Sequence, residues 1–488
     1  MFTVLALLAA ALSPALQAVE APAAAFVTLG QTDAGEQFAL ARVVIEQAGA
    51  DCPALEPTGG GQARPMTARR NPDPRHFGVT VCEAVYPTHG SRLRVAGSSV
   101  RLPAVPAEVS RLVVLGDTGC EPAYQDGCNA SAWPFAELAD SAAEPTSALV
   151  PDLVVHVGDY NYRGTPGEIE IKRPGEPARK VQVYDAGDNA PGATCKLSGP
   201  YYGQNSVGSR SPDAWPPWQQ DFFMPARRLL LSAPWIFARG NHELCSRAGP
   251  GYFYLLDPGS DLVPGSGGQL ACPPAEAAEP LVFRRPYRID LGELAVVVLD
   301  SANACDQGDL HQGHFDAQFA RVRSLVRAAS AEQAIWLLTH RPLWGVNKPE
   351  DDTPQSDLDA SGKYLVIDKT LQTAYAREPL PKPVRLVLSG HMHRFQAIAF
   401  EPLGELPSQL IVGNGGVDLD ANYPEEPFAV DIGEATAVGF GLSRFGYLDI
   451  ALHGRGWSGR LLNPAGNPLA RCGSARTGPT GVCEPAGN

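Results

Sequence analysis

Short, continuous apolar runs recur through the middle of the chain. From Arg111 onward they read LVVL, LVVHV, PWIFA, LAVVVL, IWLL and RLVLS. Runs of this length without polar interruption are typical of strands that are buried on both faces. Helical periodicity lies between some of them, most clearly in FDAQFARVRSLVRAASAEQ. The pattern predicts an α/β fold, a sandwich of layered sheets and helices.

The pattern changes on both sides of this region. Residues 24–104 alternate apolar and polar positions, as in FALARVVI and GVTVCEAVY, and the Gly- and Pro-rich stretch EPTGGGQARP interrupts them. We expect a small antiparallel β domain here, followed by the linker LPAVPAEVS. The larger domain, over residues 111–472, ends in the predicted β-strands of GYLDIALHGRGWSGRLLNPAGNPLARC, and residues 473–488 follow as a C-terminal tail.

The chain begins with an apolar segment, Met1–Ala18. Its longest apolar run, Phe2–Leu12, is too short to span a bilayer and leads into small residues. We interpret it as a secretory signal peptide that is cleaved after Ala18 or Ala21. No Lys or Arg precedes the apolar run, so a disordered or buried N-terminus is the alternative. No later stretch is long and apolar enough for a transmembrane helix. We therefore expect a secreted or periplasmic protein without stable membrane insertion.

The 10 cysteines form an even set, which indicates disulfides in an exported chain. Three local pairs are natural candidates: Cys52–Cys82, Cys120–Cys128 and Cys472–Cys483. The other four, Cys195, Cys245, Cys272 and Cys305, can pair in several ways. A zinc site is the competing interpretation, but the chain contains no CxxC pair.

Polar residues that can bind metal follow directly after five of the apolar runs. The five blocks are Gly116-Asp117-Thr118-Gly119, Gly158-Asp159-Tyr160-Asn161-Tyr162, Gly240-Asn241-His242-Glu243, Thr339-His340-Arg341-Pro342 and Gly390-His391-Met392-His393. In layered α/β proteins, ligands bind beyond the carboxyl ends of the strands. Each block alone would more often be a turn or a loop hydrogen-bonder. As an ordered set at strand ends, they predict one shared metal site.

The order of these blocks resembles the calcineurin-like metallophosphoesterase superfamily. More closely, it resembles the purple acid phosphatase branch, which reads GDxG, GDxxY, GNH(E/D), a lone His and GHxH. The resemblance covers roughly Arg111 to Cys472 and implies an α/β/β/α sandwich. Typical members of the superfamily carry D-x-H in the first block, whereas this chain has Gly119 in place of that histidine. Tyr162 stands where the branch places a phenolate ligand, so the loss in one block is matched by a gain in another.

The resemblance implies two metal ions that share Asp159. The first ion would be bound by Asp117, Asp159, Tyr162 and His393. The second would be bound by Asp159, Asn241, His340 and His391. A phenolate with two carboxylates suits Fe(III), and an amide oxygen with two imidazoles suits Zn, Mn or Fe(II).

The same resemblance implies catalytic roles for residues beside the ligands. His242 resembles the family's histidine that contacts phosphate and protonates the leaving group. Arg341 and Arg394 flank ligand histidines and would meet phosphate oxygens, with surface or supporting positions as their alternative. His156 and Asp300 are interpreted as core or supporting residues. The long segment from Arg163 to Pro217, rich in Gly, Pro, Ser and Asn, is expected to shape the substrate pocket.

These inferences favour a hydrolase of phosphate monoesters in which a metal-bound hydroxide attacks phosphorus. The alternatives are a phosphodiesterase or nucleotide hydrolase on the same site, or a non-catalytic exported protein that binds phosphate or acts in adhesion. The net charge of −14 repels polyanions, so we expect a small phosphate ester as partner and no nucleic acid. Bound metal ions would supply the positive centre that the acidic surface lacks. The family also suggests a fibronectin- or immunoglobulin-like module for the N-terminal β domain.

Overall fold

The computed structural model describes most of the chain beyond residue 21. The described residues are 22–90, 92–122, 125–144, 150–163, 213–245, 247–273, 282–306, 311–349, 361–367, 369–401, 406–420, 427–474 and 482–486, with the backbone of 168–171 and 179–182. The predicted signal peptide lies outside these residues, as does most of the long segment from Arg163 to Pro217.

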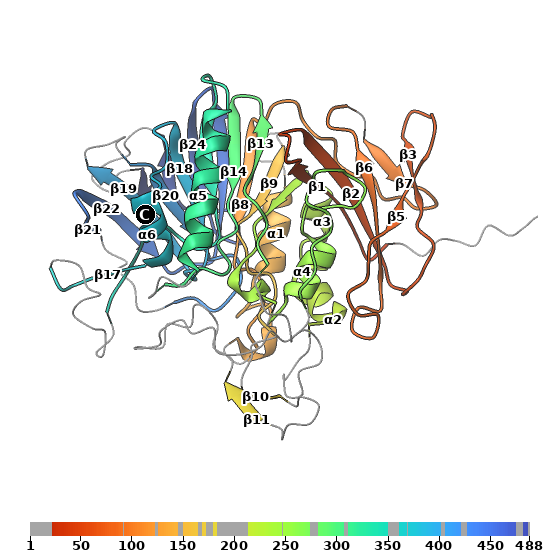
Figure 1. Ribbon diagram of the computed structural model, residues 1–488, viewed down its shortest axis with the longest axis horizontal. Coiled ribbons are helices and arrows are strands. Elements are labelled where there is room, and N and C mark those ends of the chain that lie inside the picture. The colour runs from red at the N-terminus through yellow and green to blue at the C-terminus, as the bar shows by residue number, and fades with distance from the viewer. Residues whose placement is uncertain are drawn as a thin grey trace, which may run out of the picture.

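Two large sheets form the centre of the molecule (Figure 1). The larger has 11 strands, in the order β26 (Cys483–Pro485), β25 (Pro468–Gly473), β24 (Gly456–Leu462), β23 (Tyr447–His453), β8 (Arg111–Leu115), β9 (Leu153–His156), β12 (Trp235–Phe237), β1 (Ala24–Gln31), β2 (Gln37–Ile45), β6 (Thr80–Tyr86) and β5 (Thr67–Ala68). Strands β8, β9, β12 and β1 are parallel to one another. The predicted apolar runs LVVL, LVVHV and PWIFA therefore occupy the middle of this sheet.

The smaller of the two has 8 strands, in the order β13 (Tyr287–Leu291), β14 (Leu294–Val298), β15 (Ala334–Leu338), β18 (Val384–Ser389), β20 (Ser408–Val412), β19 (Phe395–Glu401), β22 (Ala435–Leu442) and β21 (Phe428–Ile432). Strands β14, β15, β18 and β20 are parallel. Minor sheets are formed by β3 (Ala54–Pro57), β4 (Arg64–Pro65) and β7 (Leu93–Val95), by β10 (Glu168–Ile171) and β11 (Arg179–Gln182), and by β16 (Gly345–Asn347) and β17 (Leu365–Ile367).

The two large sheets pack against each other, and helices cover their outer faces. The helices are α1 (Phe135–Ala143), α2 (Trp215–Trp218), α3 (Arg227–Leu230), α4 (Gly249–Leu255), α5 (Gln312–Arg327) and α6 (Lys369–Arg377), with the short turns η1 (Asp126–Cys128), η2 (Gln219–Phe223) and η3 (Asn241–Glu243). In β8, Leu112 and Val114 point into the core between the sheets, while Val113 and Leu115 pack under α1. Helix α5 packs in the same way on the outer face of β14 and β15. This alternation explains why the central strands are apolar throughout, and it confirms the predicted α/β sandwich.

The N-terminal strands are antiparallel, as expected, but they also continue the larger sheet. Strand β1 pairs with β12 in parallel, with Thr28 opposite Trp235. Two buried arginines reinforce this junction: Arg42 donates to the carbonyl of Leu255 at 2.9 Å, and Arg69 donates to that of Phe253 at 2.8 Å. Both carbonyls belong to α4, which follows the Asn241 block. The division into residues 24–104 and 111–472 stays a prediction, and any such boundary runs through one continuous sheet.

Disulfides join all three predicted local pairs, Cys52–Cys82, Cys120–Cys128 and Cys472–Cys483. A further bridge links Cys245 to Cys272, and Cys305 is also disulfide-bonded. The Cys472–Cys483 bridge ties β26 to the edge of the larger sheet, so part of the predicted C-terminal tail is an ordered strand.

Among the residues that the structure describes, no helix has the length and apolar character needed to cross a membrane.

Candidate metal centre

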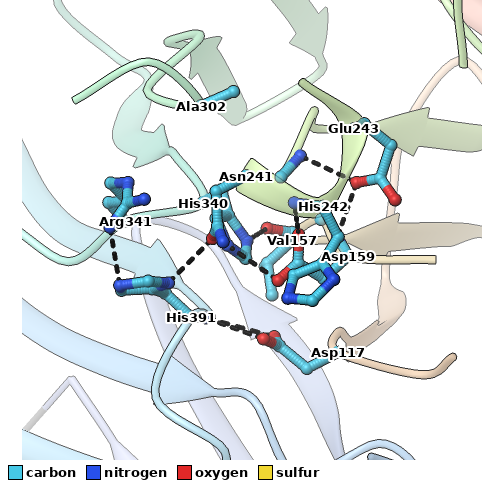
Figure 2. Close-up of polar contacts among 12 residues, drawn as sticks. Asp117, Val157, Asp159, Asn241, His242, Glu243, Ala302, His340, Arg341 and His391 are labelled. Carbon is cyan, nitrogen blue, oxygen red and sulfur yellow. Dashed lines mark hydrogen bonds and ion pairs between the residues drawn. The ribbon is translucent and has the colours of Figure 1, made fainter. Parts of the chain in front are cut away.

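The seven predicted ligand residues meet at one edge of the sandwich. Asp117, Asp159 and Asn241 follow β8, β9 and β12, which are neighbours in the larger sheet. His340 and His391 follow β15 and β18, which are neighbours in the smaller sheet. Because these strands are parallel within each sheet, their carboxyl ends meet, and Figure 2 shows the side chains pointing toward one another.

Three of these residues have a left-handed backbone, which is uncommon for residues other than glycine. The φ angles are 54° for Asp117, 61° for Asp159 and 73° for His391. Main-chain bonds between the loops hold this conformation: the amide of Asp117 donates to the carbonyl of Gly158 at 2.9 Å, and that of Thr118 donates to the carbonyl of Asp159 at 3.0 Å. Strained backbone that persists at clustered ligand positions is typical of functional sites.

Glu243 fastens two of these loops from inside the protein. Its carboxylate is fully buried and accepts hydrogen bonds from the amides of Asp159, Tyr160, Asn161 and Gly240, at 2.9 to 3.3 Å. The first three amides belong to the loop after β9, and the fourth belongs to the loop after β12. Glu243 therefore sets the distance between Asp159 and Asn241.

Glycines precede two of the ligands where neighbouring side chains lie too close for a larger residue. A Cβ atom on Gly240 would stand 1.9 Å from Oδ1 of Asp159, and one on Gly390 would stand 2.2 Å from Oδ2 of Asp117. Distances below 3.0 Å are not compatible with a real Cβ atom. The close approach of the backbone to these two carboxylates therefore requires glycine at both positions.

Two carboxylate oxygens and one imidazole nitrogen converge on the hydroxyl of Tyr162. Its Oη lies 3.1 Å from Oδ2 of Asp159, 3.3 Å from Oδ1 of Asp117 and 3.2 Å from Nε2 of His393. The single phenolic proton satisfies only one of the two carboxylate oxygens. Burial, and the nearby carboxylates of Asp159 and Asp117, raise the pKa of Tyr162 well above its usual value.

A second convergence surrounds the amide oxygen of Asn241. Nε2 of His340 lies 2.8 Å from this oxygen, and Nδ1 of His391 lies 2.9 Å from it. The opposite nitrogen of His340, Nδ1, lies 2.9 Å from the carbonyl of Val157 and donates its proton there. In a neutral ring this leaves Nε2 without a proton, facing both Asn241 and Oδ2 of Asp159, which is 3.3 Å away. In that tautomer of His340, the lone pair of Nε2 faces the lone pairs of both oxygens with no hydrogen between them.

This arrangement fits bound cations. Ligand atoms of Asp159, His340 and His391 lie within 4.8 Å of one another, close enough to share one ion. Burial and the Asp159 carboxylate raise the pKa of Asp117 well above its usual value, which reflects the cost of two buried carboxylates side by side. Burial disfavours the charged form of Asp159, and positive charge on the rings of His340 and His242 holds the pKa of Asp159 well below its usual range. When both rings are neutral, a bound metal ion would supply that positive charge instead. A positive ion between these lone pairs would remove the mutual repulsion in both groups.

Residues 110–395 match the family model of the calcineurin-like phosphoesterases. This match covers more than half of the chain. The chain belongs to the calcineurin-like phosphoesterase family. Membership makes it a phosphoester hydrolase and implies a dinuclear metal site and a small phosphate-ester substrate.

A solved structure of similar fold is the purple acid phosphatase PPD1 from seeds of yellow lupin (Lupinus luteus). Its TM-score is 0.53 with 12% sequence identity, and the alignment covers 91% of this chain and 72% of the lupin chain. At this identity the similarity concerns the fold, and it confirms the layered arrangement of the phosphoesterase. Among curated protein sequences, none matches this chain.

Gly119 and Tyr162 are related in space as well as in sequence. A Cβ atom on Gly119 would stand 2.5 Å from the carbonyl oxygen of Tyr160 and 2.8 Å from the ring of Tyr162. The tyrosine ring therefore occupies the space into which any side chain at position 119 would extend. This geometry accounts for the paired change that the sequence shows in the first two blocks.

The three predicted catalytic residues of this phosphoesterase lie in different settings. His242 borders the centre: its ring stands 3.8 Å from that of Tyr162, and its Nδ1 has no hydrogen-bond partner within the described part of the chain. Arg341 is fully buried behind His391, with Nη1 2.7 Å from Asp306. Arg394 is fully buried too and packs against Gly441 of β22. Neither arginine is a surface residue, and their contact with phosphate stays a prediction.

The supporting residues were only partly visible in the sequence. His156 is buried, 2.9 Å from the hydroxyl of Thr118, and Asp300 pairs with Arg239 at 2.9 Å, directly before Gly240. Both positions agree with the supporting roles that we expected. Asp306, which contacts His391 at 2.9 Å, follows no apolar run, so nothing in the sequence pointed to it. Glu243 also had no predicted role, although its position inside the third block was a usable signal.

Proposed function

We propose that this phosphoesterase is a dinuclear-metal hydrolase of phosphate monoesters. The proposed ligands are Asp117, Asp159, Tyr162, Asn241, His340, His391 and His393. One observation carries the proposal: lone pairs of buried side chains converge in two groups, and Asp159 contacts Tyr162 in one group and His340 in the other. Two cations that share Asp159 would satisfy both groups at once.

The donor atoms of the two groups favour different ions. Asp117, Asp159 and Tyr162 supply carboxylate and phenolate oxygens, with His393 as the single nitrogen, and such a hard set suits Fe(III). Asn241, His340 and His391 supply one amide oxygen and two imidazole nitrogens, which suit Zn, Mn or Fe(II). When bound, the ions would generate a nucleophile from water near neutral pH and neutralise charge on the phosphate.

The residues around the ions would orient the substrate. His242 is the proposed contact to phosphate, because its ring is held against Tyr162 and its Nδ1 is uncommitted among the described residues. The amide of His242 donates to Oδ1 of Asp159 at 2.9 Å, which fixes the histidine relative to the shared ligand. Similarity in fold to a purple acid phosphatase supports the choice of a monoester over a diester.

Metal analysis combined with a visible spectrum tests the proposed pair of ions. We expect two ions per chain, one of them iron, and a charge-transfer colour that disappears in Tyr162→Phe. Tyr160→Phe is the matched control, because this buried phenol donates to the carbonyl of Ala238 at 2.9 Å and is not part of the centre. Active, colourless protein with two ions but no iron would refute the Fe(III) assignment. Protein that binds no metal would refute the dinuclear site.

Chromogenic monoester and diester substrates test the reaction. We expect kcat/KM to be higher for the monoester with metal-loaded protein. A preference for the diester would identify a phosphodiesterase or nucleotide hydrolase instead. Absence of hydrolysis of any ester across a range of pH would favour the non-catalytic binding protein.

We also propose that the protein is secreted or periplasmic. The predicted signal peptide and the disulfides of the described chain support this, because such bridges persist in oxidising compartments. N-terminal sequencing of exported protein should begin after Ala18 or Ala21. An intact Met1 on cytoplasmic protein would contradict the proposal.

A further inference from the structure

The two imidazoles at the Asn241 oxygen use opposite ring nitrogens. His340 points Nε2 at Asn241 and donates through Nδ1 to a backbone carbonyl, that of Val157. His391 points Nδ1 at Asn241, so its Nε2 faces away from the centre. An imidazole flips or changes tautomer easily unless its second nitrogen is held. The question is therefore what holds Nε2 of His391.

Asp306 lies directly against that nitrogen. Its Oδ2 is 2.9 Å from Nε2 of His391, and its Oδ1 is 2.7 Å from Nη1 of Arg341. The same Nη1 also lies 2.7 Å from Nε2 of His391, as Figure 2 shows. Because the guanidinium only donates and the carboxylate only accepts, Nε2 either accepts from Arg341 or donates to Asp306, and only the second choice leaves Nδ1 bare for a metal ion. The Asp306 side chain is only 1% exposed, so water does not compete for these bonds. Arg341 is 0% exposed and balances the charge of the carboxylate, which offsets the free-energy cost of burying a charged aspartate in a low-dielectric interior.

The backbone of Asp306 is fixed independently of the metal centre. Its carbonyl accepts the amide of Lys369 at 2.9 Å. The preceding residue, Cys305, is disulfide-bonded, and its amide and carbonyl both bond to the hydroxyl of Thr370, at 3.1 and 3.0 Å. Asp306 is thus anchored to the start of α6, and its carboxylate is a fixed reference point for the ring of His391.

We propose that Asp306 is a positioning residue for the Asn241–His340–His391 half of the centre. By accepting the Nε2 proton of His391, it fixes the tautomer in which Nδ1 is bare and directed at the site. Arg341 then acts through Asp306 and His391, and not as a direct contact to phosphate. The inference rests on the proposed dinuclear function and predicts a selective effect, because the described contacts of Asp306 reach His391 and not Asp117, Tyr162 or His393.

The experiment compares Asp306→Ala and Asp306→Asn with wild-type protein and with Asp449→Asn. Asp449 is a matched control: it is buried and pairs with Arg111 at 2.6 Å, far along the sheet from the centre. Metal content is measured after dialysis against graded chelator, together with the visible spectrum, the urea unfolding midpoint and kcat/KM. Asparagine can still offer one oxygen to His391, so it should be the milder change.

We expect Asp306→Ala to bind one of the two ions roughly 10- to 100-fold more weakly, with Asp306→Asn between it and wild type. The ion beside Tyr162, and any colour that it produces, should be retained. Asp449→Asn should lose stability but keep both ions. Wild-type affinity for both ions in Asp306→Ala would overturn the inference, as would equal loss of both ions in both Asp306 variants. A wild-type protein without metal would instead refute the proposed function itself.

Discussion

The two large sheets contribute different atoms to one site. Of the seven proposed ligands, those on the larger sheet offer oxygen: Asp117, Asp159, Asn241 and Tyr162. Those on the smaller sheet offer nitrogen: His340, His391 and His393. On the larger sheet, which we call the oxygen side, the backbone positions the donors: Asp117 and Asp159 have positive φ angles, and Glu243 accepts the amides of the loop that carries Asp159. The smaller sheet is the nitrogen side. The nitrogen side depends on partners of the opposite ring nitrogens: the carbonyl of Val157 for His340 and, as we propose, the carboxylate of Asp306 for His391.

The difference follows from the chemistry of the donors. A carboxylate or amide oxygen has lone pairs in several directions, so it is aimed by placing its backbone. A neutral imidazole has one bare nitrogen, so a hydrogen bond must also fix which of its two nitrogens carries the proton. Backbone changes should therefore damage the oxygen side, and removal of single hydrogen bonds should damage the nitrogen side.

The largest effect is expected where the two sides meet. Asp159 lies 3.1 Å from Oη of Tyr162 and 3.3 Å from Nε2 of His340. Asp159→Ala should remove both ions, and kcat/KM should fall roughly 1000-fold or more, because each ion contributes several kcal/mol of charge stabilisation. His340→Ala should remove one ion only. Two retained ions in Asp159→Ala would show that this residue does not join the halves.

A smaller effect is expected from Glu243→Gln. Each carboxylate oxygen of Glu243 accepts two backbone amides, and glutamine would turn one of these oxygens into a donor. The free energy of unfolding in urea should fall by about 1–3 kcal/mol, because buried amides lose their acceptor. Activity should fall as well, since Asp159 and Asn241 separate. Glu83→Gln, a buried change at the Arg69 pair in the N-terminal strands, should lower stability alone. Unchanged activity in Glu243→Gln would contradict the claim that Glu243 fixes the distance between Asp159 and Asn241.

The smallest effect on activity is expected from Asp213, which lies in the packing behind the oxygen side and acts on the pH dependence of stability. Asp213 accepts hydrogen bonds from Nε1 of Trp218 at 2.8 Å and from the amide of Gly251 at 2.6 Å, and Trp218 stacks on Tyr160. Burial raises the pKa of Asp213 from 3.8 to about 7. The folded chain therefore holds this proton more tightly than the unfolded chain does. Its contribution to stability is complete below about pH 4 and is lost as the pH rises to about 7.

In this interval the contribution of Asp213 to the unfolding free energy should fall by about 1.4 kcal/mol per pH unit. Urea unfolding at several pH values measures the slope, and Asp213→Asn should reduce it by that amount. An identical slope in the variant would show that Asp213 is ionised throughout the range. Activity per folded molecule should change little, because Asp213 touches none of the seven ligand residues in its described contacts.

Much of the fold and the centre could be predicted from the sequence, because both depend on local signals. Buried parallel strands need continuous apolar runs, and the ligand blocks stand where those runs end. The support of the centre was harder to predict. Asp306 follows no strand and carries no motif, and it becomes relevant only because its backbone is fixed beside α6. The pairing of β1 with β12 joins positions 28 and 235, and alternation within β1 does not reveal its partner.

The sequence by itself determined which residue types are available to the centre and that each of them follows the end of a strand. It placed Asp117, Asp159, Asn241, His340 and His391 after apolar runs, and it paired Gly119 with Tyr162 as a coordinated departure from the D-x-H pattern. Only the tertiary structure decided that oxygen comes from one sheet and nitrogen from the other. It also placed Val157 and Asp306 against the outer ring nitrogens of His340 and His391, which by our proposal leaves the inner nitrogens bare. Strand ends are encoded by neighbouring residues, whereas proton positions depend on partners that the folded chain brings together.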